Sequence, residues 1–162
     1  MYRKTYLSDS DTEVESRDGV QAKMLILGAP RVGKTSFITR LTQGYFTMYY
    51  EPTKLIEIYR EVQIGDIGFT LWDIPPTIRY HFKLTCLTAD VVLLMFDSTR
   101  PKTKEMVMTY WKKLYAQLKN IPYIFVVGVR MPKQREEGVF YIDNMSTVGY
   151  NDLLFNIQNT IR

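Results

Sequence analysis

Residues 28–35 read Gly28-Ala29-Pro30-Arg31-Val32-Gly33-Lys34-Thr35, which matches the pattern GxxxxGK[ST] without a mismatch. The stretch follows the apolar run at residues 24–27 and precedes residues 34–42, where apolar side chains recur at helical spacing. A buried strand, a glycine-containing loop and a helix start, in this order, form a nest of backbone N–H groups that binds phosphate. The residues predicted to line this phosphate loop are Gly28, Arg31, Val32, Gly33, Lys34, Thr35 and Ser36.

Two side chains of the phosphate loop predict its chemistry. The Lys34 ammonium is expected to reach the β- and γ-phosphates of a nucleotide, and the Thr35 hydroxyl to bind Mg²⁺. Pro30 removes one N–H donor from the nest. The motif by itself does not separate a GTPase from a small-molecule kinase.

The rest of the chain alternates between strand-like and helix-like segments. Strands are predicted over residues 24–27, 54–64, 69–73, 91–96, 123–127 and 139–142, with a hairpin turn at 65–68. A helix with an apolar face over 107–118 follows Pro101, with Ser98 or Thr99 as its cap, and a last helix covers about 153–161. This order predicts a three-layer α/β domain with a mostly parallel sheet.

Composition and charge divide the chain in two. The 162 residues carry a net charge of +4, but residues 1–20 hold five acids and three bases, which leaves +6 on residues 21–162. Sparse apolar residues predict a flexible acidic and polar tail over 1–20 and one globular domain over 21–162. A single cysteine, Cys86, and a single histidine, His81, argue against a disulfide framework and a histidine metal site. No RNA-binding signature accompanies the basic charge, so nucleic acid is not an expected partner.

Several segments downstream of the phosphate loop resemble the Ras superfamily of small GTPases, of the Rab, Ran or Ras kind. They are Phe46, Tyr50-Glu51-Pro52-Thr53, Leu71-Trp72-Asp73, Thr88-Ala89-Asp90 and Phe96-Asp97-Ser98-Thr99. The resemblance covers about residues 22–162 and implies a P-loop G domain with one antiparallel edge hairpin. It implies that Phe46 packs against the guanine edge and that Tyr50 lies over the phosphates. It also implies that Thr53 and Asp73, with Thr35, hold Mg²⁺.

The sequence departs from the family pattern where hydrolysis takes place. Asp-x-x-Gly-Gln of the family is replaced by Asp73-Ile74-Pro75-Pro76-Thr77. Pro76 has no N–H to give to the γ-phosphate, and Thr77, at the usual glutamine position, is too short to orient the attacking water. No intact catalytic residue remains at these positions, and hydrolysis by the usual route is expected to be lost or very slow.

The segments that recognise guanine in the family are also replaced. Val129-Arg130-Met131-Pro132 stands where the family has Asn-Lys-x-Asp, and Met145-Ser146-Thr147 stands opposite Ser-Ala-Lys. Arg130 is expected to lie over a purine as the family lysine does. Only 17 residues run from Val129 to Met145, too few for the helix that the family carries there, so a domain shortened between its fifth and sixth strands is predicted.

Two functional hypotheses follow. In the first, the chain is an atypical small GTPase that binds GTP or GDP with Mg²⁺, hydrolyses slowly or not at all, and presents switch I, residues 50–54, to an effector or adaptor protein. In the second, it is a nucleotide-free pseudo-GTPase that serves as an interaction scaffold. A third hypothesis, which the sequence supports less, is that the chain is an ATP-using P-loop kinase. The chain shows no prenylation motif, so a cytoplasmic monomer without a direct lipid anchor is expected, with membrane association only through a partner.

Overall fold

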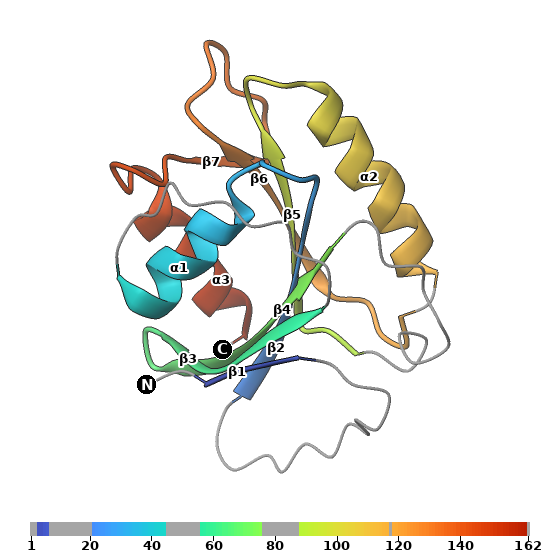
Figure 1. The fold of residues 1–162 in the computed structure, drawn as a ribbon, viewed down its shortest axis with the longest axis vertical. Coiled ribbons are helices and arrows are strands. Elements are labelled where there is room, and N and C mark those ends of the chain that lie inside the picture. The colour runs from blue at the N-terminus through green and yellow to red at the C-terminus, as the bar shows by residue number, and fades with distance from the viewer. Residues whose placement is uncertain (1–2, 7–20, 45–55, 76–87, 117, 162) are drawn as a thin grey trace.

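The computed structural model describes residues 3–6, 21–44, 56–75, 88–116 and 118–161 (Figure 1). Its elements are β1 (Arg3–Tyr6), β2 (Gln21–Gly28), α1 (Lys34–Gln43), β3 (Glu57–Ile64), β4 (Ile67–Ile74), β5 (Val91–Asp97), α2 (Lys102–Tyr115), β6 (Tyr123–Val129), β7 (Val139–Ile142) and α3 (Tyr150–Ile161). The seven strands form one sheet in the order β1-β3-β4-β2-β5-β6-β7. β2 is parallel to β4 and β5, and β5, β6 and β7 continue the parallel arrangement.

The sheet is covered on both faces, as the predicted three-layer fold requires. Helices α1 and α3 lie on one side of the sheet and α2 on the other (Figure 1). Successive residues of β2 alternate between the two layers, because Met24 and Ile26 belong to the core under α1 and α3 while Leu25 and Leu27 belong to the core under α2. The segment of β2 at residues 24–27 is therefore apolar at every position, which is the pattern that predicted a parallel sheet.

Strand β1 differs from the flexible tail expected over residues 1–20. Residues 3–6 pair antiparallel with β3, and Lys4 forms an ion pair of 3.3 Å with Glu57. A free sheet edge offers backbone hydrogen bonds to a short strand whatever its hydrophobicity, so sparse apolar residues did not reveal this pairing. The hairpin of β3 and β4 is confirmed, but β1 lies outside it at the edge of the sheet. The remaining residues of the expected tail lie outside the described part of the chain.

Two further predictions concern helix boundaries. The connection between β6 and β7, residues 130–138, contains no helix, which confirms the predicted shortening. The predicted cap of α2 is wrong, because α2 begins at Lys102 after Pro101 and no side chain caps it. The Thr99 hydroxyl instead donates to the Asp97 carboxylate at 2.7 Å.

Among the described helices, none combines the length and apolar character needed to cross a bilayer.

Candidate functional site

The phosphate loop lies between β2 and α1, at the carboxyl end of the parallel strands (Figure 1). β2 ends at Gly28 and α1 begins at Lys34, so the loop turns within residues 29–33. Gly33, the residue before α1, makes no side-chain cap, and the first turn of α1 holds no acidic residue. The N–H groups of this turn and the positive end of the helix are therefore free of competing carboxylates within α1, as an anion site requires.

Gly33 is fixed by both its backbone conformation and its surroundings. Its φ angle is 100°, in the left-handed region that favours glycine. A Cβ atom there would lie 2.8 Å from the Asn144 amide nitrogen and 2.9 Å from a methyl group of Val129. The end of the phosphate loop is thus packed directly against Val129, the last residue of β6, and against Asn144, which follows β7.

Lys34 and Asp73, which the sequence placed in one site, are in direct contact. The Lys34 ammonium lies 2.7 Å from the Asp73 carboxylate, and both side chains are buried. Lys34 also donates to the carbonyl oxygen of Ile74 at 3.4 Å. The contact follows from the sheet order, because β4 is the parallel neighbour of β2 and Asp73 stands opposite Ile26 near the strand ends.

The donor atoms at this position suit Mg²⁺. Thr35 lies half-buried at the start of α1, and the Asp73 carboxylate is buried beside Lys34. Within the described residues, no group of three or more His, Cys, Asp and Glu side chains is arranged to hold a metal ion by itself. A site of few protein oxygens fits Mg²⁺, which keeps several waters and is shared with substrate phosphates.

Several predicted site residues lie outside the described part of the chain: Phe46, Tyr50, Thr53, Pro76 and Thr77. Pro75 is described and is buried, and its carbonyl oxygen accepts a hydrogen bond of 2.8 Å from the Tyr110 hydroxyl of α2. The start of the proline pair is therefore held against α2.

The last residue of β6 and the residues that follow β6 and β7 lie beside the phosphate loop. We call residues 129–132 and 143–148 the base-side edge. Arg130 is exposed, has a φ of 75°, and donates its backbone N–H to the Ile142 carbonyl at 2.8 Å. Buried Asn144 donates from its amide nitrogen to the Gly33 carbonyl at 3.0 Å and accepts a hydrogen bond from the Tyr150 hydroxyl. Asn144 thus connects the phosphate loop to the start of α3.

Burial raises the pKa of Tyr150, and Asp143 adds to this effect while Arg40 opposes it. The hydroxyl therefore remains protonated at neutral pH and can donate to Asn144. Arg40 in turn donates to the carbonyl oxygens of Asn144 and Met145 at 2.8 and 3.1 Å. The Arg40 side chain consequently connects helix α1 to the turn after β7.

Asp97, at the end of β5, is connected to the phosphate loop through Arg100. Burial disfavours its charge, but hydrogen bonds from Thr99 and Arg100 outweigh burial and hold the pKa of Asp97 below its ordinary value. Arg100, whose Nε lies 3.0 Å from this carboxylate, also donates to the Arg31 carbonyl oxygen. Arg100 therefore links the end of β5 to the middle of the loop.

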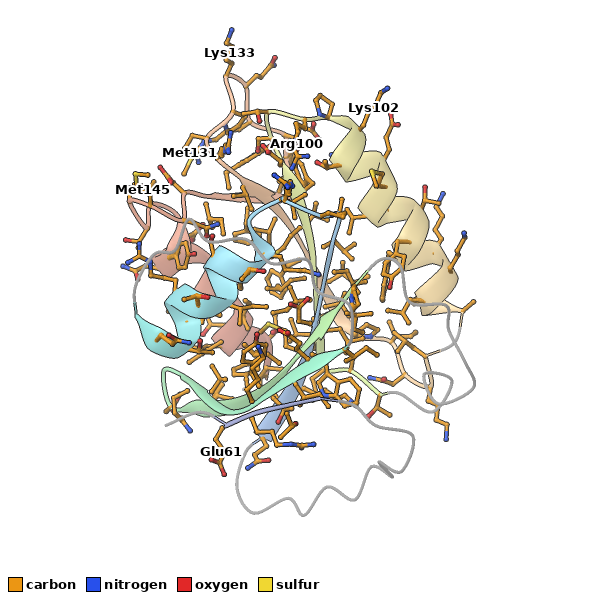
Figure 2. The ribbon with its side chains drawn as sticks, viewed as in Figure 1. Glu61, Arg100, Lys102, Met131, Lys133 and Met145 are labelled. Carbon is orange, nitrogen blue, oxygen red and sulfur yellow. The ribbon has the colours of Figure 1, made fainter. Side chains whose placement is uncertain are left out.

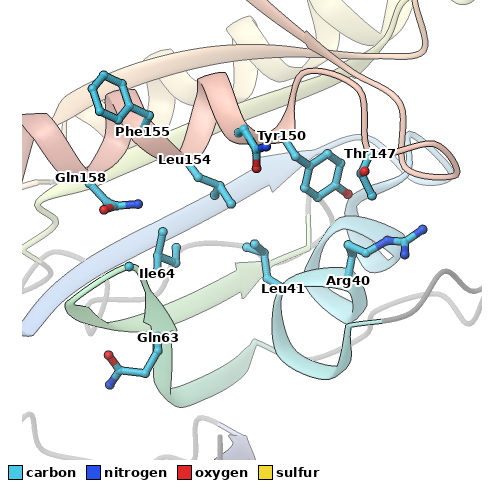
Figure 3. Close-up of a pocket in the computed structure, with 11 residues that line it drawn as sticks. Arg40, Leu41, Gln63, Ile64, Thr147, Tyr150, Leu154, Phe155 and Gln158 are labelled. Atoms are coloured by element: carbon cyan, nitrogen blue, oxygen red, sulfur yellow. The ribbon is translucent and has the colours of Figure 1, made fainter.

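Two of the grooves among the described residues differ in their relation to this site. One, of about 490 Å³, is lined by Gly28, Ala29 and residues of α2, so it adjoins the phosphate loop. The other, of about 580 Å³, lies between α1, α3 and the turn of the β3–β4 hairpin (Figure 3). It contains none of residues 28–36, although Arg40 and Tyr150 connect it to the base-side edge.

The comparison with known families agrees with this geometry. The sequence model of the Ras family matches residues 23–152, from β2 into α3. The chain belongs to the Ras family. Its relatives include the GTP-binding protein rho2 of Schizosaccharomyces pombe, 26% identical over 66% of this chain and 56% of that protein. The human Rho-related GTP-binding protein RhoE is 29% identical over 64% of this chain and 44% of its own length. The chain thus spans about half the length of these curated relatives.

The sequence motifs do not predict two residues that contact the candidate phosphate loop. The family pattern places Met145-Ser146-Thr147 opposite Ser-Ala-Lys and predicts no role for Asn144, yet the Asn144 side chain contacts the loop. Arg100 lies one residue beyond the segment 96–99 and belongs to no predicted motif, although its guanidinium donates to the Arg31 carbonyl oxygen. A signal existed only for Asn144, since a short amide at the end of a buried strand is a frequent partner for backbone groups. For Arg100 the partner is 69 residues away, and nothing local indicates it.

Proposed function

We propose that this Ras-family protein binds a nucleoside di- or triphosphate through residues 28–36 and with Mg²⁺. GDP and GTP are the first candidates for this nucleotide. The phosphate loop carries the proposal, because it runs from the end of β2 through Gly33, with a φ of 100°, into the N-terminus of α1, whose first turn holds no acidic residue. Thr35 and Asp73, with Thr53, would hold the ion. When bound, Mg²⁺ would neutralise phosphate charge.

In this proposal, the protein hydrolyses its nucleotide slowly or not at all and acts as a switch or adaptor through residues 50–54. The sequence supports this, since proline and threonine replace the residues that contact the γ-phosphate and orient water. The bond from Tyr110 to the Pro75 carbonyl also supports it, because it restrains the start of this segment. In single-turnover assays with Mg²⁺–GTP, we expect phosphate release below about 10⁻⁴ per second, under the unassisted Ras rate of about 3–5 × 10⁻⁴ per second. Release at or above that rate would contradict slow hydrolysis.

The test of binding uses the full chain. Nucleotide extracted from the purified protein is identified by mass spectrometry, and Mg²⁺–GDP is then titrated into nucleotide-stripped protein. We expect bound nucleotide and a rise in melting temperature on adding Mg²⁺–GDP. Thr35→Ala should weaken binding at least about tenfold, because the hydroxyl is a proposed metal ligand. Thr39→Ala, one turn further along α1 and also half-buried, is the matched control and should change affinity less than about threefold.

A second candidate function is a nucleotide-free scaffold. The Lys34–Asp73 ion pair favours it, because the pair already compensates both charges without a ligand. An empty protein that gains no thermal stability from Mg²⁺–nucleotide would support the scaffold and exclude the binding function, whereas stoichiometric bound nucleotide would exclude the scaffold.

A further inference from the structure

Two residues of the phosphate loop have a left-handed backbone conformation, and only one of them is a glycine. Gly33 has a φ of 100°, and Arg31, two residues earlier, has a φ of 63°. From the contacts of Arg31, we propose that Arg100 is a positioning residue, which holds the phosphate loop in the conformation that binds phosphate. The inference rests on the nucleotide binding proposed above and adds the side chain that prepares the loop for it.

The left-handed conformation of Arg31 is part of the shape of the loop. Backbone N–H groups converge on one point where left-handed residues alternate with right-handed ones, which is the geometry of an anion-binding nest. Val32, which separates Arg31 from Gly33, does not have a positive φ. A non-glycine residue occupies the left-handed region about 5- to 30-fold less than the right-handed one, because its Cβ crowds the following carbonyl oxygen. Arg31 therefore needs a contact that holds it there, whereas a glycine would not.

The Arg100 guanidinium provides such a contact. It donates to the Arg31 carbonyl oxygen, and its Nε lies 3.0 Å from the Asp97 carboxylate. Figure 2 shows Arg100 at the end of the molecule where the phosphate loop joins β2 to α1. Because two different nitrogen atoms of one planar group bind the two partners, the Arg31 carbonyl is fixed relative to the end of β5.

The carboxylate that holds Arg100 is itself fixed by the fold. Asp97 is buried and accepts hydrogen bonds from the backbone N–H of Thr99 at 2.9 Å and from its hydroxyl at 2.7 Å. The backbone N–H of Asp97 donates to the Thr103 hydroxyl, in the first turn of α2, at 2.9 Å. Arg100 therefore reaches the loop from an ordered support. A loop that is ordered before its ligand arrives loses less conformational freedom on binding, which raises the affinity.

Removal of this contact should weaken phosphate binding, because fewer molecules keep the loop in its binding conformation. We expect Arg100→Ala to raise the Kd of Mg²⁺–GDP for the nucleotide-stripped full chain by about 5- to 30-fold, the range by which the left-handed region is disfavoured. Tripolyphosphate, which has neither base nor sugar, should lose affinity by the same factor. The matched control is Arg135→Ala, an exposed arginine whose guanidinium contacts the Met131 sulfur at 3.7 Å. It should change either Kd less than about threefold.

A second substitution tests whether Arg100 acts through Arg31. Glycine adopts the left-handed region without strain, so Arg31→Gly removes the need for the contact. In the Arg31→Gly background, Arg100→Ala should therefore raise both Kd values less than about threefold. No loss of affinity in the original background, or an equal loss in the two backgrounds, would overturn the inference. A loss for Mg²⁺–GDP without one for tripolyphosphate would overturn it as well, because Arg100 would then act on the nucleoside.

A measurement without nucleotide separates failure of this inference from failure of the proposed function. In the nucleotide-free full chain, the backbone ¹⁵N order parameters of residues 31–33 should be about 0.85, the value of a rigid backbone, and should fall by at least about 0.1 in Arg100→Ala. Arg135→Ala should leave them unchanged. A smaller fall in Arg100→Ala would overturn the inference even if nucleotide binds. If the original chain binds neither Mg²⁺–GDP nor tripolyphosphate, the proposed function fails, and the order parameters alone decide whether Arg100 holds the loop.

Discussion

The hydrogen bonds of Asn144 give a stability prediction that can be worked out from the structure. Asn144→Ala removes the acceptor of the Tyr150 hydroxyl and one of the donors to the Gly33 carbonyl. The hydroxyl belongs to a buried residue, so leaving it unpaired costs about 1–3 kcal/mol, and the lost bond to Gly33 about 1 kcal/mol. The Gly33 carbonyl still accepts from the Phe37 N–H at 3.0 Å, which limits its loss. The expected reduction in the free energy of unfolding is about 2–4 kcal/mol.

Urea denaturation followed by circular dichroism measures this loss through the midpoint at constant slope. In a thermal melt, the same loss corresponds to about 4–16 °C for a chain of this size. Asn159→Ala, an exposed change of the same type on α3, should alter stability by less than about 0.5 kcal/mol.

A double-mutant cycle decides whether the two side chains act as a pair. Tyr150→Phe alone leaves the Asn144 oxygen without its donor. In the double variant both partners are absent, so its loss should be smaller than the sum of the single losses by about 1 kcal/mol or more. Additive effects within about 0.5 kcal/mol, or a loss below about 1 kcal/mol for Asn144→Ala, would refute the assigned hydrogen bond.

Three other predictions follow from individual contacts. Gly33→Ala should reduce the free energy of unfolding measured in urea by about 2–5 kcal/mol, since it adds left-handed strain and a contact of 2.8 Å with Asn144. The control is Gly44→Ala, which has a φ of 79° and no atom within 4 Å and should show only the strain of about 1–2 kcal/mol. Equal losses of stability in the two variants would contradict the crowding at Gly33. Burial lowers the pKa of Lys23 to about 8, with Asp90 opposing and Arg60 adding to the shift. Above about pH 8 the unfolded chain therefore binds more protons than the folded chain, so the free energy of unfolding should rise between about pH 8 and 10, by up to about 3 kcal/mol. Denaturation curves measured across this range test the rise, and Lys23→Met should abolish it. Lys4→Ala breaks the partly exposed pair with Glu57 and should cost less than about 1 kcal/mol; a loss above 2 kcal/mol would show that β1 contributes more to the fold than one ion pair at a sheet edge.

The sequence by itself determined the layers of the fold and the centre of the site. Apolar runs such as 24–27 and 91–96 became strands buried on both faces, and the loop at 28–35 was placed correctly between a strand and a helix. Local patterns suffice for these features because burial on both faces and a helix start depend on residues that are neighbours along the chain.

Only the tertiary structure decided which side chains meet at that site. The contact of Lys34 with Asp73 requires β4 to lie next to β2, and the bonds from Asn144 to Gly33 and from Arg100 to Arg31 join segments 111 and 69 residues apart. Strand β1 was hidden for the same reason, since pairing with the edge of β3 depends on unpaired backbone groups that no side-chain pattern in residues 3–6 records. Hydrogen-bond partners across a sheet are selected by strand order and register, which a local sequence pattern does not contain.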